Sequence, residues 1–159
     1  MTSREDVARA MAYFEHADEV ALLHELLAEV APKAKRLVGQ FLQRGGEEAI
    51  PGPSDLRPAR VAASREEALR TLRATNDFAL LQVLARTIGR RIEAVEIAAS
   101  ADFPEGVRVV VPEGHGYPRS GRELEGTVEE TGTTLQVLLD NGETWTGPPS
   151  LARLARGRR

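Results

Sequence analysis

Three histidines are the side chains of this sequence best suited to metal binding or proton transfer, and cysteine is absent. The lack of cysteine excludes disulfides, thiolate-bound metals and a cysteine nucleophile. On a single helix, His16 and His24 would lie two turns apart and about 80° from each other around the axis, which does not form a compact metal site. We therefore expect neither a metal ion nor another cofactor.

The third histidine lies in a segment rich in glycine, residues 113–118, which reads EGHGYP. Glycine and proline predict a loop, in which the titratable ring of His115 is close to the aromatic ring of Tyr117. A plain surface loop is the simplest interpretation. If the segment has a function, we expect contact with a partner, because a general base also needs a positioned partner group and a pocket, which the sequence does not show.

The signatures of common hydrolases and phosphate-binding proteins are missing from the sequence. It contains no G-x-x-x-x-G-K-[ST], no G-x-S-x-G and no H-E-x-x-H. We therefore predict that the protein is not an enzyme. A catalytic site that forms only on folding, near His115 and Tyr117, is the remaining catalytic hypothesis.

Positive charge is concentrated in two parts of the chain. Residues 32–63 have a net charge of +3 and residues 151–159 a net charge of +4, whereas residues 1–31 have a net charge of −5. Basic clusters suit nucleic acid, because lysine and arginine release counterions when they bind phosphates. Under a nucleic-acid hypothesis, the contacting side chains are Lys33, Lys35, Arg36, Arg86, Arg90, Arg153, Arg156, Arg158 and Arg159.

The first part of the chain predicts helices. Ser3 can cap a first helix, on which Val7 and Phe14 fall at helical spacing. Residues 18–30 carry an apolar band too wide for a helix that packs on one neighbour only. Pro32 suits the first turn of a helix, so we expect one helix to end before Pro32 and a further helix to begin there.

Residues 45–63 are rich in proline and glycine and predict a long loop. The S-x-x-E motif at Ser64 predicts a short helix through Arg73, and residues 75–77 offer a cap for a long helix. We expect the long helix to pack antiparallel on residues 18–30 in a hairpin or bundle, with the core of a homodimer as the alternative. Its apolar stripe consists of Leu81, Leu84, Ile88, Ile92 and Val95.

From Gly106 onward the apolar residues alternate, which predicts β-strands, and Asn141-Gly142 predicts a tight hairpin. A two-residue turn would pair Trp145 with Leu138, on the face opposite Val137, where it could meet a partner. A three-residue turn would place Trp145 beside Val137 in the core. The sequence leaves both registers open.

Three predicted strands carry the glycines and alternating residues of a small barrel: Gly106–Val109, Gly126–Val128 with the preceding Gly121, and Leu135–Asp140. In this pattern the segment 105–150 resembles the KOW-type SH3-like barrel. The resemblance implies five strands and binding to ribosomal RNA, the transcription machinery or another protein. In charge the segment departs from RNA-binding members, because residues 102–150 hold three arginines against nine acidic residues, a net charge of −6 that repels phosphate.

The sequence thus predicts an α+β protein, with a helical domain at residues 1–101, a small SH3-like barrel at 102–150 and a basic tail at 151–159. It contains no long apolar run, so we expect no membrane contact and a cytoplasmic location. The predicted function is a non-catalytic binding or regulatory module for a protein partner; a nucleic-acid-associated protein that uses residues 32–63 and the tail is the alternative. The predicted partner contacts are His115, Tyr117, Leu138 and Trp145.

Overall fold

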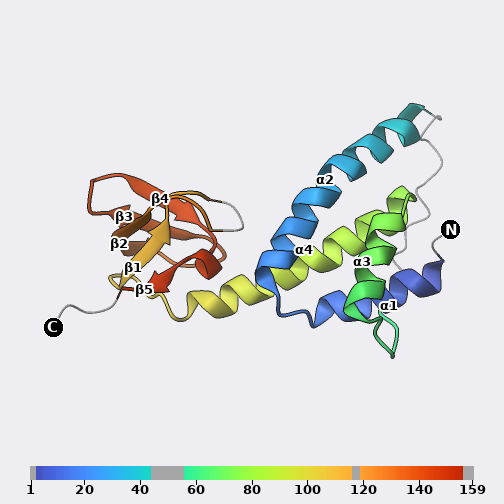
Figure 1. Cartoon of the computed structure of the whole chain (residues 1–159), viewed down its shortest axis with the longest axis horizontal. Helices are drawn as coiled ribbons and strands as arrows, with labels where there is room; N and C mark the ends of the chain where they lie inside the picture. Colours follow the sequence, from blue (N-terminus) through green and yellow to red (C-terminus); the bar gives the residue numbers. More distant parts are fainter. Residues whose placement is uncertain (1–2, 44–55, 116–118, 156–159) are drawn as a thin grey trace. The chain divides into compact units, whose positions relative to one another are not determined.

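A computed structural model describes residues 3–43, 56–115 and 119–155 of the chain. In these residues four α-helices precede a five-stranded antiparallel sheet, which confirms the predicted α+β class (Figure 1). The chain forms two compact units, Met1–Arg91 and Ile92–Arg159, and the division falls inside the fourth helix. The helices are α1 (Arg4–Glu15), α2 (Val20–Gln43), α3 (Arg65–Ala74) and α4 (Phe78–Ser100).

The first helix begins at the predicted cap. The Asp6 N–H donates to Ser3 Oγ (3.1 Å) and the Ser3 N–H donates to Asp6 Oδ2 (3.3 Å), so both residues complete a capping box. Hydrogen bonding of the Asp6 carboxylate to the side chain and the backbone N–H of Ser3 holds the pKa of Asp6 below its ordinary value. Val7 and Phe14 are completely buried, as their helical spacing predicts.

Helix α2 is continuous, and Pro32 lies inside it, so the predicted restart at Pro32 is wrong. An interior proline removes one backbone hydrogen bond and crowds the preceding turn. Contacts on both sides of the proline hold the helix together. Val30 is buried, Glu29 pairs with the Arg73 side chain (3.1 Å), and Lys33 Nζ donates to the Arg73 backbone oxygen (2.8 Å).

Helices α1 and α3 lie side by side in the first unit (Figure 1). Ser64 Oγ accepts from the Glu67 N–H (3.2 Å) at the start of α3, and the Glu67 carboxylate pairs with Arg9 of α1 (2.9 Å). Residues 56–63 are the described part of the predicted loop at 45–63. This segment runs alongside α1, where the Ala63 N–H donates to the Arg9 carbonyl oxygen (3.0 Å).

The apolar stripe of α4 belongs to the core of a single chain. Leu81, Leu84 and Ile88 are completely buried, and Leu23 of α2 is buried as well. These three side chains of the stripe are therefore covered within one copy of the chain. Burial therefore supports the interpretation as an intramolecular core.

In the second unit the last strand returns to pair with the first, an arrangement compatible with an SH3-like barrel. The strand order is β4-β3-β2-β1-β5, and the 3-10 helix η2 (Pro149–Leu151) precedes the last strand. Leu151 is completely buried and Leu154 pairs with Val109, so the start of the predicted tail at 151–159 is part of the sheet. The strands are β1 (Arg108–Pro112), β2 (Glu123–Glu130), β3 (Leu135–Leu139), β4 (Thr144–Gly147) and β5 (Arg153–Leu154).

The hairpin between β3 and β4 has a three-residue turn, Asp140–Gly142. The Leu139 N–H donates to the Glu143 backbone oxygen (2.8 Å). Gly142 supplies the positive φ of 88° that the turn needs. This register pairs Val137 with Trp145, so the two-residue register is wrong. The three-residue turn also avoids placing the carboxylates of Asp140 and Glu143 directly opposite each other.

A buried carboxylate joins the end of α4 to the sheet. Glu96 is 2% exposed, and its Oε2 accepts from the Ser150 N–H (2.8 Å) while Oε1 accepts from the Ser150 hydroxyl. Such donors are what a buried carboxylate requires. The last turns of α4 therefore belong to the second unit, although the composition changes only after residue 101.

We predict that Gly126→Ala destabilises the second unit by about 1–3 kcal/mol, the usual cost of overpacking. A Cβ at Gly126 would lie 2.5 Å from the Leu138 backbone oxygen and 2.7 Å from Val137 Cγ1. Gly132→Ala is the matched control, since the nearest atom there would be 3.9 Å away. Chemical denaturation measures both variants, and an equal loss of stability in the two would contradict the close strand packing.

Candidate functional site

The loop between β1 and β2 is held against β4 by His115. Its Nδ1 lies 2.9 Å from the Thr146 backbone oxygen, and its ring stacks on the Trp145 indole with centroids 5.7 Å apart and planes 17° apart. A carbonyl oxygen only accepts hydrogen bonds, so Nδ1 carries the hydrogen of this contact. The structure therefore brings together two of the four predicted contact residues.

The base of this loop is tied down on both sides. The Gly114 N–H donates to the Ser120 oxygen (3.0 Å), and Arg119 Nη1 donates to the Leu151 oxygen (2.6 Å). Residues 116–118 lie outside the described part of the chain, and with them the predicted contact residue Tyr117. Its role stays a prediction.

Trp145 is a core residue, which corrects its assignment to a partner-facing surface. Only 2% of it is exposed, and its ring packs so closely on Gly147 that a Cβ there would lie 2.6 Å from two ring atoms. The ring Nε1 is buried without a hydrogen-bond partner among the described residues. His115 therefore covers an indole whose donor is unused in this part of the structure.

Leu138 lies on the other face of the sheet from Trp145. It pairs with Thr127 and Thr144, whereas Trp145 pairs with Val137. Leu138 is 42% exposed. We call this side of the sheet the outer face; it carries Arg108, Thr127, Leu138 and Thr144.

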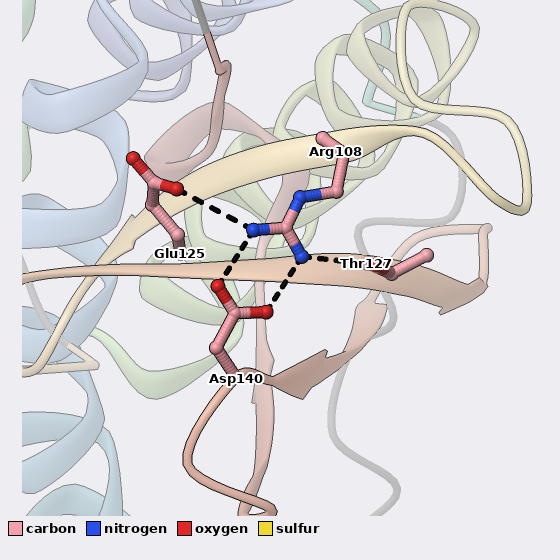
Figure 2. Close-up of polar contacts among 4 residues, drawn as sticks. All are labelled: Arg108, Glu125, Thr127 and Asp140. Atoms are coloured by element: carbon pink, nitrogen blue, oxygen red, sulfur yellow. Dashed lines mark hydrogen bonds and ion pairs between the residues drawn. The ribbon is translucent and has the colours of Figure 1, made fainter. Parts of the chain in front are cut away.

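The outer face also holds a network of charged groups around Arg108 (Figure 2). The two terminal nitrogens of Arg108 each donate to one Asp140 oxygen at 2.6 Å, and Nη2 also contacts Glu125 Oε2 at 3.4 Å. Hydrogen bonding to Arg108 holds the pKa of Asp140 below its ordinary value. This network could not be predicted from sequence spacing, because Arg108 lies on β1, Glu125 and Thr127 lie on β2, and Asp140 lies in the turn after β3.

The predicted nucleic-acid contacts have different environments. Lys33 binds the Arg73 backbone oxygen, and burial lowers its pKa below the ordinary value. Arg153 pairs with Glu123. In the ranges that the structure describes, no ion pair engages the exposed side chains of Lys35, Arg36, Arg86 and Arg90. Three further arginines, Arg156, Arg158 and Arg159, lie outside those ranges.

The helical unit has one polar cleft of note among its described residues. The cleft lies between α1 and α3 and has a volume of about 280 Å³. The charges of Arg9 and Glu67 neutralise each other, because the two side chains form an ion pair between the walls of the cleft. We therefore do not assign it a ligand. The lining residues are Asp6, Arg9, Ala63, Glu67, Arg70 and Thr71.

Within residues 3–43, 56–115 and 119–155, no group of three or more histidines and acidic residues is arranged to hold a metal ion. No helix in those same ranges has the length and apolar character needed to cross a membrane. No family model, curated protein or solved structure matches the chain.

We predict that Arg108→Gln raises the pKa of Asp140 towards its ordinary value, because the hydrogen bonds that lower it are removed. A carbon-detected NMR titration of the Asp140 carboxyl measures this shift. Arg122→Gln, which removes the ion pair of Arg122 with Glu113 (3.1 Å), is the control and should leave Asp140 unchanged. An Asp140 titration that is the same in Arg108→Gln and in the wild type would contradict the network.

The same shift predicts a pH dependence of stability. The pKa of Asp140 is lower in the folded chain than in the unfolded chain, so the interaction stabilises the fold above the unfolded pKa. That stabilisation is lost as the pH falls through the folded pKa. The difference in melting temperature between wild type and Arg108→Gln should therefore be largest near neutral pH and should narrow in acid.

Proposed function

We propose that this protein is a non-catalytic binding module that recognises a protein partner through its sheet unit. The observation that carries the proposal is the outer face, where Arg108 already binds Asp140 and Glu125 beside the exposed Leu138. An arginine whose donors are occupied by carboxylates is poorly placed to bind phosphate. A surface with an exposed apolar side chain and neutralised charges suits a protein partner better.

The charge of the sheet unit supports the same proposal. Residues 102–150 have a net charge of −6, and the whole unit, residues 92–159, has a net charge of −4, which disfavours nucleic acid and favours a basic partner surface. The strand order is compatible with an SH3-like barrel, and we assign it to the KOW type as part of this proposal. Barrels of that type bind proteins as well as RNA, and the charge here favours proteins. A cytoplasmic location completes the proposal.

The alternative is a nucleic-acid-associated protein that binds through the helical unit. It is favoured by the exposed arginines Arg86 and Arg90, which are one turn apart on α4 and form no ion pair with other described residues. Lys35 and Arg36 of α2 are exposed as well. Binding through these groups would weaken steeply with salt.

We predict that the full chain forms no salt-sensitive complex with a mixed pool of labelled RNA and DNA. Fluorescence anisotropy at about 50 mM and about 200 mM salt covers the range over which phosphate binding changes most. A complex that dissolves as salt rises would contradict the proposal. If Arg86→Gln with Arg90→Gln also abolished that complex, the alternative would be established.

We further predict that a partner captured by the immobilised chain is lost in Leu138→Thr and kept in Leu154→Thr. Threonine is favourable in strands, so both variants should keep the fold. Leu154 is the matched control because it is also an exposed strand leucine, 54% exposed against 42% for Leu138. Retention of the partner by both variants would contradict a role for the outer face.

A further inference from the structure

We propose that the free edge of β4 binds an extended basic segment of a partner protein as an added strand. In the absence of the partner, the His115 side chain covers part of this edge, and the added strand displaces it. The inference rests on the proposed function and specifies its binding mode. It depends on where the backbone groups of Thr144 and Thr146 point, on what covers them and on which charges surround them.

The hairpin register determines the direction of these backbone groups. Leu139 and Glu143 form a hydrogen-bonded pair, so in the alternating antiparallel pattern the next such pair is Val137 with Trp145. The N–H and C=O groups of Thr144 and Thr146 therefore point away from β3. Since β4 is the last strand in the sheet order, no further strand of the described sheet pairs with them.

A single side chain covers this edge in the described structure. His115 binds the Thr146 oxygen, and no other hydrogen bond within the described ranges uses the edge groups of Thr144 or Thr146. Proteins usually protect an exposed edge with charges, a bulge, very short strands or a covering loop. The opposite edge follows that rule, because β5 has only two residues, Arg153–Leu154. The edge of β4 is longer, with four residues, and His115 is the one described side chain that hydrogen-bonds to it.

The residue on which His115 stacks also holds a hydrogen-bond donor that is unused in the described part of the chain. The His115 ring stacks on Trp145, whose buried Nε1 has no acceptor among the described residues. An unpaired buried donor is costly, so an incoming carbonyl group that reached it would gain a hydrogen bond without breaking another. This unused donor belongs to the residue between Thr144 and Thr146, whose backbone groups face the edge.

The charges near the edge select a basic occupant. Glu143 is exposed and directly precedes β4, and Glu130 lies in the same cross-strand row as Thr146 through Gln136. Neither glutamate forms an ion pair within the described part of the chain. Added strands gain affinity from main-chain hydrogen bonds and specificity from alternate side chains. An extended segment with Lys or Arg at alternate positions fits this edge, whereas a second copy would bring its own acidic residues against it.

The probe for this proposal is an eight-residue peptide of alternating arginine and valine, titrated into the full ¹⁵N-labelled chain. We expect the largest amide shifts at Thr144 and Thr146, and no binding when arginine is replaced by glutamate. N-methylation of alternate peptide nitrogens should also abolish binding, because it removes main-chain donors but keeps the charge. Binding of the methylated peptide with equal affinity would overturn strand addition.

Two variants of the chain test the edge itself. His115→Ala should bind the peptide about fivefold more tightly, the equivalent of one hydrogen bond that no longer has to be broken. Thr146→Pro should abolish binding, because its N–H points outward and proline there removes no bond of the sheet. Leu154→Thr, on β5 at the opposite end of the sheet order, is the control that leaves the edge of β4 unchanged. Far-UV circular dichroism checks the fold, and if Thr146→Pro does not fold, the methylated peptide still decides.

The outcomes separate this inference from the proposed function. Peptide shifts confined to Arg108, Thr127 and Leu138 would overturn the edge site and leave the outer face as a binding surface. If the chain captures a partner but binds none of the peptides, the edge site is likewise overturned and the outer face remains the binding surface. A mass that doubles with concentration, and no longer does so in Thr146→Pro, would make a second copy the occupant and overturn the inference. Salt-sensitive binding to nucleic acid with no captured protein would instead overturn the proposed function.

Discussion

The register of the β3–β4 hairpin determines most of what the second unit presents. A turn of three residues, with Gly142 at positive φ, pairs Val137 with Trp145. That pairing buries the indole, leaves Leu138 on the outer face and directs the Thr146 carbonyl outward to His115. A shift of one residue would exchange the two faces and remove all three features.

The second unit contains one buried and one exposed polar contact, and the two differ in how far water screens them. The Glu96 carboxylate is buried and attaches the end of α4 to Ser150, so it depends on its hydrogen bonds rather than on solvent. Arg108 and Asp140 are exposed, and water and salt screen their attraction. We conclude that the first contact contributes more to the fold, whereas the second chiefly sets the charge of the outer face.

The sequence predicted those features that depend on local patterns. The Ser3 cap, the Ser64 cap and the α4 stripe follow from hydrogen bonding and helical spacing over a few residues. Features that depend on contacts between residues far apart in the sequence were predicted wrongly or were not predicted. Pro32 does not interrupt α2 because α3 binds residues on both sides of it, and Glu96 resembles an ordinary surface acid until Ser150, 54 residues away, packs on it.

Among the residues that the structure describes, the outer edge of β4 is open except at His115. Hydrogen exchange of the backbone amides in the free full chain tests it directly, because the same strand contains both kinds of N–H. We predict slow exchange at Trp145, whose N–H points towards β3, and fast exchange at Thr144 and Thr146. Protection of Thr146 equal to that of Trp145 would contradict the account, because the edge would then already be occupied.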